Sequence, residues 1–150
     1  TSYLLTTLIH EYAHILTLDL EQEPAGGGEC EPEFRSQGCW YDDAYLAAFW
    51  DEFWRGYGDE ATEIGSEDDE ARDAFYDAHE EDFVSSYAAT SVEEDIAESF
   101  MAYVIEAVPD PSQSTVAAKL AFFERYPELA AIRERIRAEF GDELQPVWDE

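Results

Sequence analysis

The sequence HEYAH at residues 10–14 lies inside a run that predicts one continuous helix over residues 1–18. On a helix, side chains four positions apart stand one above the other on the same face. His10 and His14 can therefore present two imidazole nitrogens to one metal ion. Glu11 points about a quarter turn away, so its carboxylate reaches a water on the metal more easily than the metal itself. Two nitrogen ligands beside a carboxylate base are the arrangement that a zinc hydrolase needs.

The other residues of this helix indicate which of its faces is buried. HExxH also arises by chance, and a lone histidine on a helix is more often a surface or core residue, so the surroundings matter. The histidines share a small and polar face with Thr6, Ala13 and Thr17. The apolar stripe beside that face consists of Leu4, Leu5, Leu8, Ile9, Tyr12, Ile15 and Leu16. We expect the stripe to pack into the core and the histidines to line a cleft next to it.

A second group of acidic residues follows in the sequence FVSSYAATSVEEDIAESFMAYV, which starts at Phe83. Ser91 is a favourable N-cap, and the apolar spacing after it predicts a helix over residues 92–107. Glu94 and Glu98 share a second face of this helix, four positions apart. Carboxylates on an otherwise apolar helix are costly to bury unless a cation compensates them. A metal ion held by the two histidines of the first helix is such a cation.

Glu94 has an alternative role that the sequence leaves open. Ser91 and Glu94 match a capping box, in which the glutamate side chain folds back onto the N-cap amide. This role accounts for Glu94 but leaves Asp95, Glu98 and the HExxH sequence unexplained. One carboxylate cannot fold back and bind a metal at the same time, so the structure distinguishes the two roles.

The charge of the chain excludes several classes of partner. It carries 37 Asp and Glu residues against 8 Lys and Arg, which gives a formal net charge of −29. Such a surface repels nucleic acid and anionic membranes and attracts cations and basic peptides. The acidity also fits a highly solvated surface adapted to high salt, and its self-repulsion favours a monomer. Because 45% of the residues are apolar, we expect one folded domain over residues 1–150, without a membrane span.

Two cysteines flank the end of a glycine-rich loop over residues 19–38. Cys30 and Cys39 favour a disulfide and therefore an oxidising, extracellular or secreted location. The alternative is a pair of free thiols in a reducing cytosol. Their spacing matches no common zinc-binding motif. The sequence also opens inside a helix without an initiator methionine, so we expect the C-terminal catalytic part of a longer chain.

The remaining segments predict further helices by their apolar spacing. These helices are expected over residues 40–57, 66–79, 112–125 and 127–140. The first carries an aromatic stripe that we interpret as core, and the last has Phe140 among its inward positions. We interpret His79 as an exposed histidine at a helix end, with contact to a substrate or leaving group as the alternative. A basic cluster is interpreted as a solvated or salt-bridged face and consists of Arg133, Arg135 and Arg137.

With HEYAH and YAATSVEEDIAESF both present, the chain resembles the gluzincin metallopeptidases, above all the anthrax lethal factor-like catalytic domain and related secreted zinc peptidases. In those proteins a tyrosine precedes the ligand glutamate by seven residues, and a second acidic residue follows it by four. The matching residues here are Tyr87, Glu94 and Glu98. The resemblance implies a mainly α, zincin-like domain with little or no sheet, in which the HExxH helix packs against the glutamate-bearing helix.

The resemblance also implies a zinc-dependent peptidase, whose Zn2+ ligands would be His10, His14 and Glu94. The fourth position would stay open for water. Glu11 would act as general base, and Tyr87 would donate a hydrogen bond to the oxyanion unless it is an ordinary half-buried tyrosine. Glu98, or Asp95 in its place, would accept a hydrogen bond from the outer nitrogen of a ligand histidine. The alternative function is a catalytically silent metal-binding or partner-binding domain derived from a peptidase.

Overall fold

The computed structural model describes residues 2–19, 22, 40–60 and 69–144. This part of the chain holds six α-helices, joined in places by short 3-10 and π-helical turns, and no β-strand. The helices are α1 (Ser2–Leu18), α2 (Tyr45–Phe49), α4 (Asp69–His79), α5 (Val92–Ile105), α6 (Thr115–Phe122) and α7 (Pro127–Phe140). The prediction of a mainly helical domain is confirmed for these residues. Cys30 and Cys39 lie outside them, so the disulfide stays a prediction.

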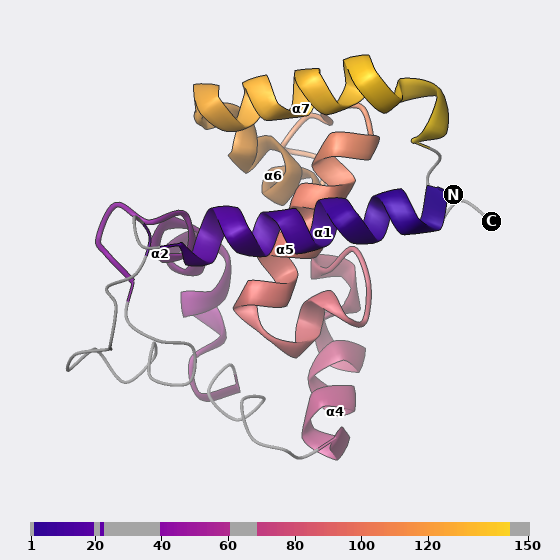
Figure 1. The fold of residues 1–150 in the computed structure, drawn as a ribbon. Helices are drawn as coiled ribbons and strands as arrows, with labels where there is room; N and C mark the ends of the chain where they lie inside the picture. The colour runs from indigo at the N-terminus through magenta and orange to yellow at the C-terminus, as the bar shows by residue number, and fades with distance from the viewer. Residues whose placement is uncertain (1, 20–21, 23–39, 61–68, 145–150) are drawn as a thin grey trace.

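Helix α5 runs through the centre of the fold. It contacts α1, α2, α6 and α7, and Figure 1 shows α1 crossing it. Every residue of α5 except Glu94 and Glu98 is buried, as expected of a helix that is apolar on most sides. Ser91 is its N-cap, as predicted, and the Ser91 Oγ accepts a hydrogen bond from the backbone N–H of Glu94 at 3.2 Å. The two residues of α5 that keep some exposure are therefore the two carboxylates singled out from the sequence.

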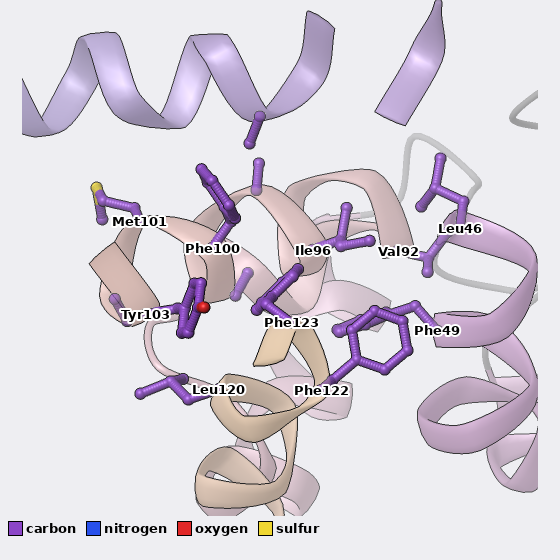
Figure 2. Close-up of a cluster of buried hydrophobic side chains, with 14 of the residues drawn as sticks. Leu46, Phe49, Val92, Ile96, Phe100, Met101, Tyr103, Leu120, Phe122 and Phe123 are labelled. Carbon is purple, nitrogen blue, oxygen red and sulfur yellow. The ribbon is translucent and has the colours of Figure 1, made fainter. Parts of the chain in front are cut away.

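The core around α5 combines aliphatic and aromatic side chains, and several of the aromatic rings pack against one another (Figure 2). Phe49 of α2 meets Phe122 at the end of α6 edge to face, with ring centroids 5.4 Å apart. Phe123 packs in the same manner against Phe100 of α5, also at 5.4 Å. Such pairs contribute about 0.5–1.5 kcal/mol each beyond the area that they bury. These contacts hold α2 and α6 against α5 and so fix the position of the helix that carries Glu94.

The aromatic segment over residues 40–57 is core, as predicted, but it is not one regular helix. After α2 the chain continues as a π-helical turn over Trp50–Trp54 and a 3-10 turn over Arg55–Tyr57. Gly58 ends the segment with a φ of 60°, a conformation that glycine adopts at little cost. The periodicity therefore predicted the buried face but not the change of helix type.

Helix α1 buries its small and polar face, and of the predicted apolar stripe it buries Ile9 and partly buries Leu5 and Leu16. The predicted orientation is therefore right for these three residues and wrong for the rest of the stripe. The buried residues of the small and polar face are Thr6, His10, Ala13 and Thr17. The exposed residues of the stripe are Leu4, Leu8, Tyr12 and Ile15. Small side chains let two helices approach closely, and the threonine hydroxyls donate to carbonyls of their own helix, as from Thr17 to Ala13 at 2.9 Å. The threonines of this face therefore need no partner from α5, whereas His10 meets the carboxylates of Glu94 and Glu98.

Helix α7 packs on α5 and differs from the prediction at two points. Phe140 is 42% exposed rather than inward. The basic cluster is not simply a solvated face, because Arg133 Nε donates to the Tyr103 carbonyl at 2.7 Å. Arg137 Nη1 likewise donates to the Val104 carbonyl at 2.8 Å. The last carbonyls of a helix have no partner within it, and cations are favourable there, so two arginines of α7 cap the end of α5.

The ends of the helices differ from the prediction by a few residues. Helix α5 ends at Ile105 instead of residue 107, and α6 begins after the N-cap Ser114 instead of at residue 112. Helix α4 ends at His79, as predicted. Among the helices of the described ranges, none is both long and apolar enough to cross a membrane.

Candidate metal centre

Helices α1 and α5 bring His10, His14 and Glu94 together. His14 Nε2 lies 2.8 Å from Glu94 Oε1 and 3.1 Å from His10 Nε2. His10 Nε2 lies 3.4 Å from Glu94 Oε2, and one ligand atom of each residue lies within 4.8 Å of the other two. In a tetrahedral zinc site with bonds of about 2.0–2.1 Å, neighbouring ligand atoms stand roughly 3.3 Å apart. The three predicted ligands are therefore spaced to hold one metal ion.

The hydrogen bonds of this group are incomplete without a cation. Glu94 Oε2 is buried and makes no well-formed hydrogen bond, since its nearest imidazole nitrogen, His10 Nε2, lies 3.4 Å away. The Nε2 atoms of His10 and His14 face each other at 3.1 Å, an arrangement in which at least one of them has to carry a proton. A buried acceptor without a partner costs about 1–3 kcal/mol. A cation among the three side chains would remove this cost, so the residues present fit a metal ion.

The charges of the group are strongly coupled. Burial of His10 opposes its protonation, but hydrogen bonds with Glu94 and Glu98 outweigh burial and raise its pKa to about 9. Burial also favours the neutral form of Glu94, yet hydrogen bonds from both imidazoles and from Tyr87 hold its pKa well below the usual range. Without a metal, His10 is therefore a cation between two carboxylates at neutral pH. The centre is arranged to receive positive charge.

Glu98 contacts the outer nitrogen of His10, the position in which we expected it from the sequence. The Nδ1 atom of His10 lies 2.9 Å from Glu98 Oε2. Glu98 Oε1 accepts a hydrogen bond from Ser85 Oγ at 2.8 Å, and Ser85 Oγ accepts one from the backbone N–H of Ala88 at 3.1 Å. This chain of contacts fixes the imidazole with Nε2 toward Glu94, as carboxylates do for metal-binding histidines.

The structure separates the alternatives for Glu94 and Asp95. Only the backbone N–H of Glu94 takes part in capping by Ser91, while its carboxylate meets the imidazoles. The Asp95 carboxylate lies on another side of α5 and accepts from Trp54 Nε1 at 2.8 Å. It also pairs with Lys119 Nζ at 2.8 Å, with both side chains fully buried. Its predicted contact with a ligand histidine is therefore wrong, because one position along a helix turns a side chain by about 100°.

Tyr87 and Glu11 lie at the accessible side of the centre. Tyr87 is 54% exposed, and its ring centroid lies 5.8 Å from that of His10. A hydrogen bond with Glu94, burial, and the negative charges of Glu94 and Glu11 raise the pKa of Tyr87 to about 12. Its hydroxyl therefore stays protonated and able to donate at neutral pH. Glu11 is exposed on α1, so both residues are open to solvent.

Glu93 is a residue that the sequence did not single out. It is 8% exposed, and its Oε2 atom is buried without a hydrogen-bond partner. Burial raises the pKa of Glu93 to about 7. The outer nitrogen of His14, Nδ1, is also buried without a partner. The sequence holds no signal for the burial of Glu93, because Glu93, Glu94 and Asp95 all stand in the first turn of α5.

His79 lies at the end of α4, away from the ligand contacts. It is partly buried, and its Nε2 lies 2.9 Å from Glu60 Oε2. Its ring packs against Tyr57 and Phe75, with centroid distances of 4.7 and 4.9 Å. The predicted position at a helix end is right, but the ring is packed and paired rather than exposed.

A cleft of about 740 Å³ adjoins Tyr87. One wall comes from α4 and the other from the residues just before α5. Its lining residues are Asp69, Arg72, Asp73, Tyr76, Asp77, Ser86, Tyr87, Ala89 and Thr90. The three aspartates recur every four positions and so follow one face of α4. Tyr87 therefore stands between the metal group and an acidic cleft.

Comparisons with family models, curated proteins and solved structures found no match to this chain. The resemblance to gluzincin peptidases stays a prediction. The contacts of the described residues give a group that fits one metal ion, with Glu11 and Tyr87 accessible beside it.

Proposed function

We propose that this protein is a zinc-dependent peptidase. The observation that carries the proposal is the meeting of His10, His14 and Glu94 at ligand spacing, with Glu11 and Tyr87 accessible beside them. Two nitrogens and one carboxylate leave the fourth position of a tetrahedral site open, as in catalytic rather than structural zinc sites. Imidazole ligands also favour zinc over magnesium and calcium, which prefer larger sets of oxygen ligands.

The side chains around the centre take distinct roles in this proposal. Zinc, when bound, lowers the pKa of a water molecule to about 7 and polarises the substrate carbonyl. Glu11 takes a proton from the attacking water and delivers it to the leaving amine. Tyr87 donates a hydrogen bond to the substrate oxygen on which negative charge develops. Glu98 keeps the imidazole of His10 oriented through its contact with Nδ1.

The substrates that suit the surroundings are basic peptides. The cleft beside Tyr87 carries Asp69, Asp73 and Asp77 along one wall. Asp69 is paired with Arg72 of the same wall at 3.5 Å, so a Lys or Arg side chain of a bound peptide would meet Asp73 and Asp77. The net charge of −29 also draws basic molecules toward the protein and disfavours nucleic acid. Charge around the site thus supports a preference for positively charged residues near the cleaved bond.

The exposed stripe of α1 favours a second function. In this function the protein is a metal-binding domain that binds a partner without cleaving it. Leu4 is 62% exposed, Leu8 55% and Ile15 63%. Apolar side chains exposed together often mark an interaction surface. Zinc binding without peptide hydrolysis by the wild-type protein separates this function from the peptidase.

Two assays test the proposal: zinc titration and hydrolysis of a mixed peptide library. Both are applied to the wild-type protein, to Glu11→Gln and to Glu94→Ala. Glu11→Gln should bind zinc like the wild type and lose about 10²–10⁴-fold in hydrolysis, because it removes only a proton acceptor. Glu94→Ala should lose zinc affinity, because it removes a ligand. Glu139→Gln, on the exposed side of α7, is the charge-matched control and should change neither property.

The outcomes separate the two functions. Normal hydrolysis by Glu11→Gln would show that the assigned base is wrong. A wild-type protein that binds zinc and cleaves none of the peptides would support the docking domain. A wild-type protein that binds no zinc contradicts both functions.

A further inference from the structure

The hydroxyl of Ser85 makes two hydrogen bonds, one in each direction. It donates to Glu98 Oε1 at 2.8 Å, and its Oγ accepts from the backbone N–H of Ala88 at 3.1 Å. An ionised carboxylate can only accept and a backbone N–H can only donate, so the direction of both hydrogen bonds is determined. The Ser85 hydroxyl therefore joins two parts of the centre, Glu98 on α5 and the turn that follows Ser85.

The turn that Ser85 holds carries Tyr87. Accepting from the N–H three residues ahead is what an N-cap serine does at the start of a helix, and here a 3-10 turn follows over Ala88–Thr90. The Tyr87 carbonyl accepts from the backbone N–H of Thr90 at 3.1 Å and from the Thr90 hydroxyl at 2.7 Å. Both alanines of the turn are buried, and the turn contacts α5. The backbone at Tyr87 is thus held on both sides, with Ser85 at the leading end.

Glu98 connects Ser85 to the metal group. Its second oxygen, Oε2, lies 2.9 Å from His10 Nδ1, so Ser85 and His10 occupy the two oxygens of one carboxylate. Capping a turn requires only that the serine accepts a hydrogen bond. The turn therefore does not explain why the hydroxyl proton is directed at a carboxylate of another helix. That hydrogen bond fixes the carboxylate that orients the imidazole.

We propose that Ser85 is a positioning residue for two groups of the centre, the imidazole of His10 and the hydroxyl of Tyr87. It acts on the imidazole through Glu98 and on the hydroxyl through the turn. The rings of Tyr87 and His10 have their centroids 5.8 Å apart, and Ser85 contributes to holding both. This inference rests on the proposed peptidase function, because it concerns how a zinc ligand and the oxyanion donor are placed relative to each other. Ser85 itself touches neither metal nor substrate.

The first test measures the zinc affinity of Ser85→Ala by competition with a chelator. The affinity should fall about 3–10-fold, as expected for one lost hydrogen bond, which is less than the roughly 10–100-fold expected when Glu98 itself is removed. Ser85→Thr keeps the hydroxyl and should restore the affinity. Ser85→Cys keeps the size with a weak donor and carries the test if the alanine variant does not fold.

Ser114→Ala is the matched control. The Ser114 Oγ also accepts from a backbone N–H three residues ahead, that of Ala117 at 3.0 Å, but it caps α6. This variant should lose stability like Ser85→Ala, and it should bind zinc and cleave peptides like the wild type.

Hydrolysis at saturating zinc tests the link to Tyr87. Ser85→Ala should lower kcat about 10-fold with little change in KM, because a misplaced oxyanion donor weakens binding of the transition state alone. In a Tyr87→Phe background the same substitution should lower kcat less than about 2-fold, because the hydroxyl that Ser85 positions is already gone.

A readout on the metal-free protein separates positioning from a general loss of stability. ¹⁵N NMR should show the His10 Nδ1–H protected from exchange in the wild type and in Ser114→Ala, and exchanging faster in Ser85→Ala. The inference is overturned, with the proposed function intact, if Ser85→Ala keeps the wild-type zinc affinity and His10 signal. An equal loss of kcat with and without the Tyr87 hydroxyl overturns it as well. Wild-type protein that binds no zinc or cleaves no peptide overturns both the inference and the proposed function.

Discussion

Zinc affinity should rise about tenfold for each pH unit from about pH 6.5 to about pH 9, because zinc has to displace a proton from His10. The hydrogen bonds with Glu94 and Glu98 outweigh burial and raise the pKa of His10 to about 9, whereas an ordinary histidine titrates near 6.5. Zinc binds the neutral imidazole. At neutral pH most of the metal-free protein therefore carries a proton where the metal has to bind.

The size of the effect follows from the pKa of His10. At pH 7 about one molecule in 100 has the neutral imidazole if the pKa is about 9, which lowers the apparent zinc affinity about 100-fold. This factor corresponds to about 3 kcal/mol. Glu94 has its pKa held well below the usual range, so it stays ionised throughout this window and adds no slope.

The same proton determines how the stability of the metal-free protein depends on pH. His10 binds its proton more tightly in the folded state than in the unfolded state, so its contribution is fully present below about pH 6.5. The contribution is lost as the pH rises through about 9. At about 1.4 kcal/mol for each pH unit, the loss amounts to about 3 kcal/mol. Saturating zinc should remove most of this dependence, since the zinc-bound imidazole is neutral and has no second proton left to lose in this pH range.

Chelator competition at several pH values measures the slope, and calorimetry in buffers of different ionisation heat counts the protons released. About one proton should leave His10 at neutral pH. Glu98→Gln is the matched variant, because removing the Glu98 charge lowers the pKa of His10 and should move the plateau to lower pH. An affinity that levels off near pH 6.5, with the same profile in Glu98→Gln, would refute the coupling between His10 and the two carboxylates.

Two further predictions concern stability and substrate choice. Asp95→Asn leaves the fully buried charge of Lys119 without its partner and should lower the free energy of unfolding by about 3–5 kcal/mol. The zinc affinity of this variant should not change, because Asp95 faces Trp54 and Lys119. Chemical denaturation measures the free energy of unfolding, and zinc titration measures the affinity. A loss of stability below about 1 kcal/mol would contradict the first expectation. Asp73→Asn combined with Asp77→Asn should lower kcat/KM for a basic peptide about 2–5-fold per charge removed and leave that for a neutral peptide unchanged. The acidic cleft would be excluded from substrate binding if kcat/KM fell equally for both peptides. The same would follow if kcat/KM for the basic peptide did not fall at either low or high salt.

Local spacing determined much of the candidate site. The interval between His10 and His14 places both rings on one face in any α-helix, and the interval between Glu94 and Glu98 does the same on the second helix. Ser91 marked the start of that helix because its side chain can accept from the free N–H groups of the first turn. These features depend on about 3.6 residues per turn and on backbone groups nearby in sequence, so they hold before any tertiary contact forms.

Tertiary structure decided which of these faces met. The packing of α1 on α5 buried the small face around Ala13 and left Leu8 exposed, against the order of hydrophobicity. The reason is that α5 is apolar on most sides and accepts whichever face lets the two helices approach closely. That choice turned the Glu94 carboxylate to the imidazoles rather than to its own N-cap. Sequence spacing thus fixes which side chains share a face, and only packing decides what that face contacts.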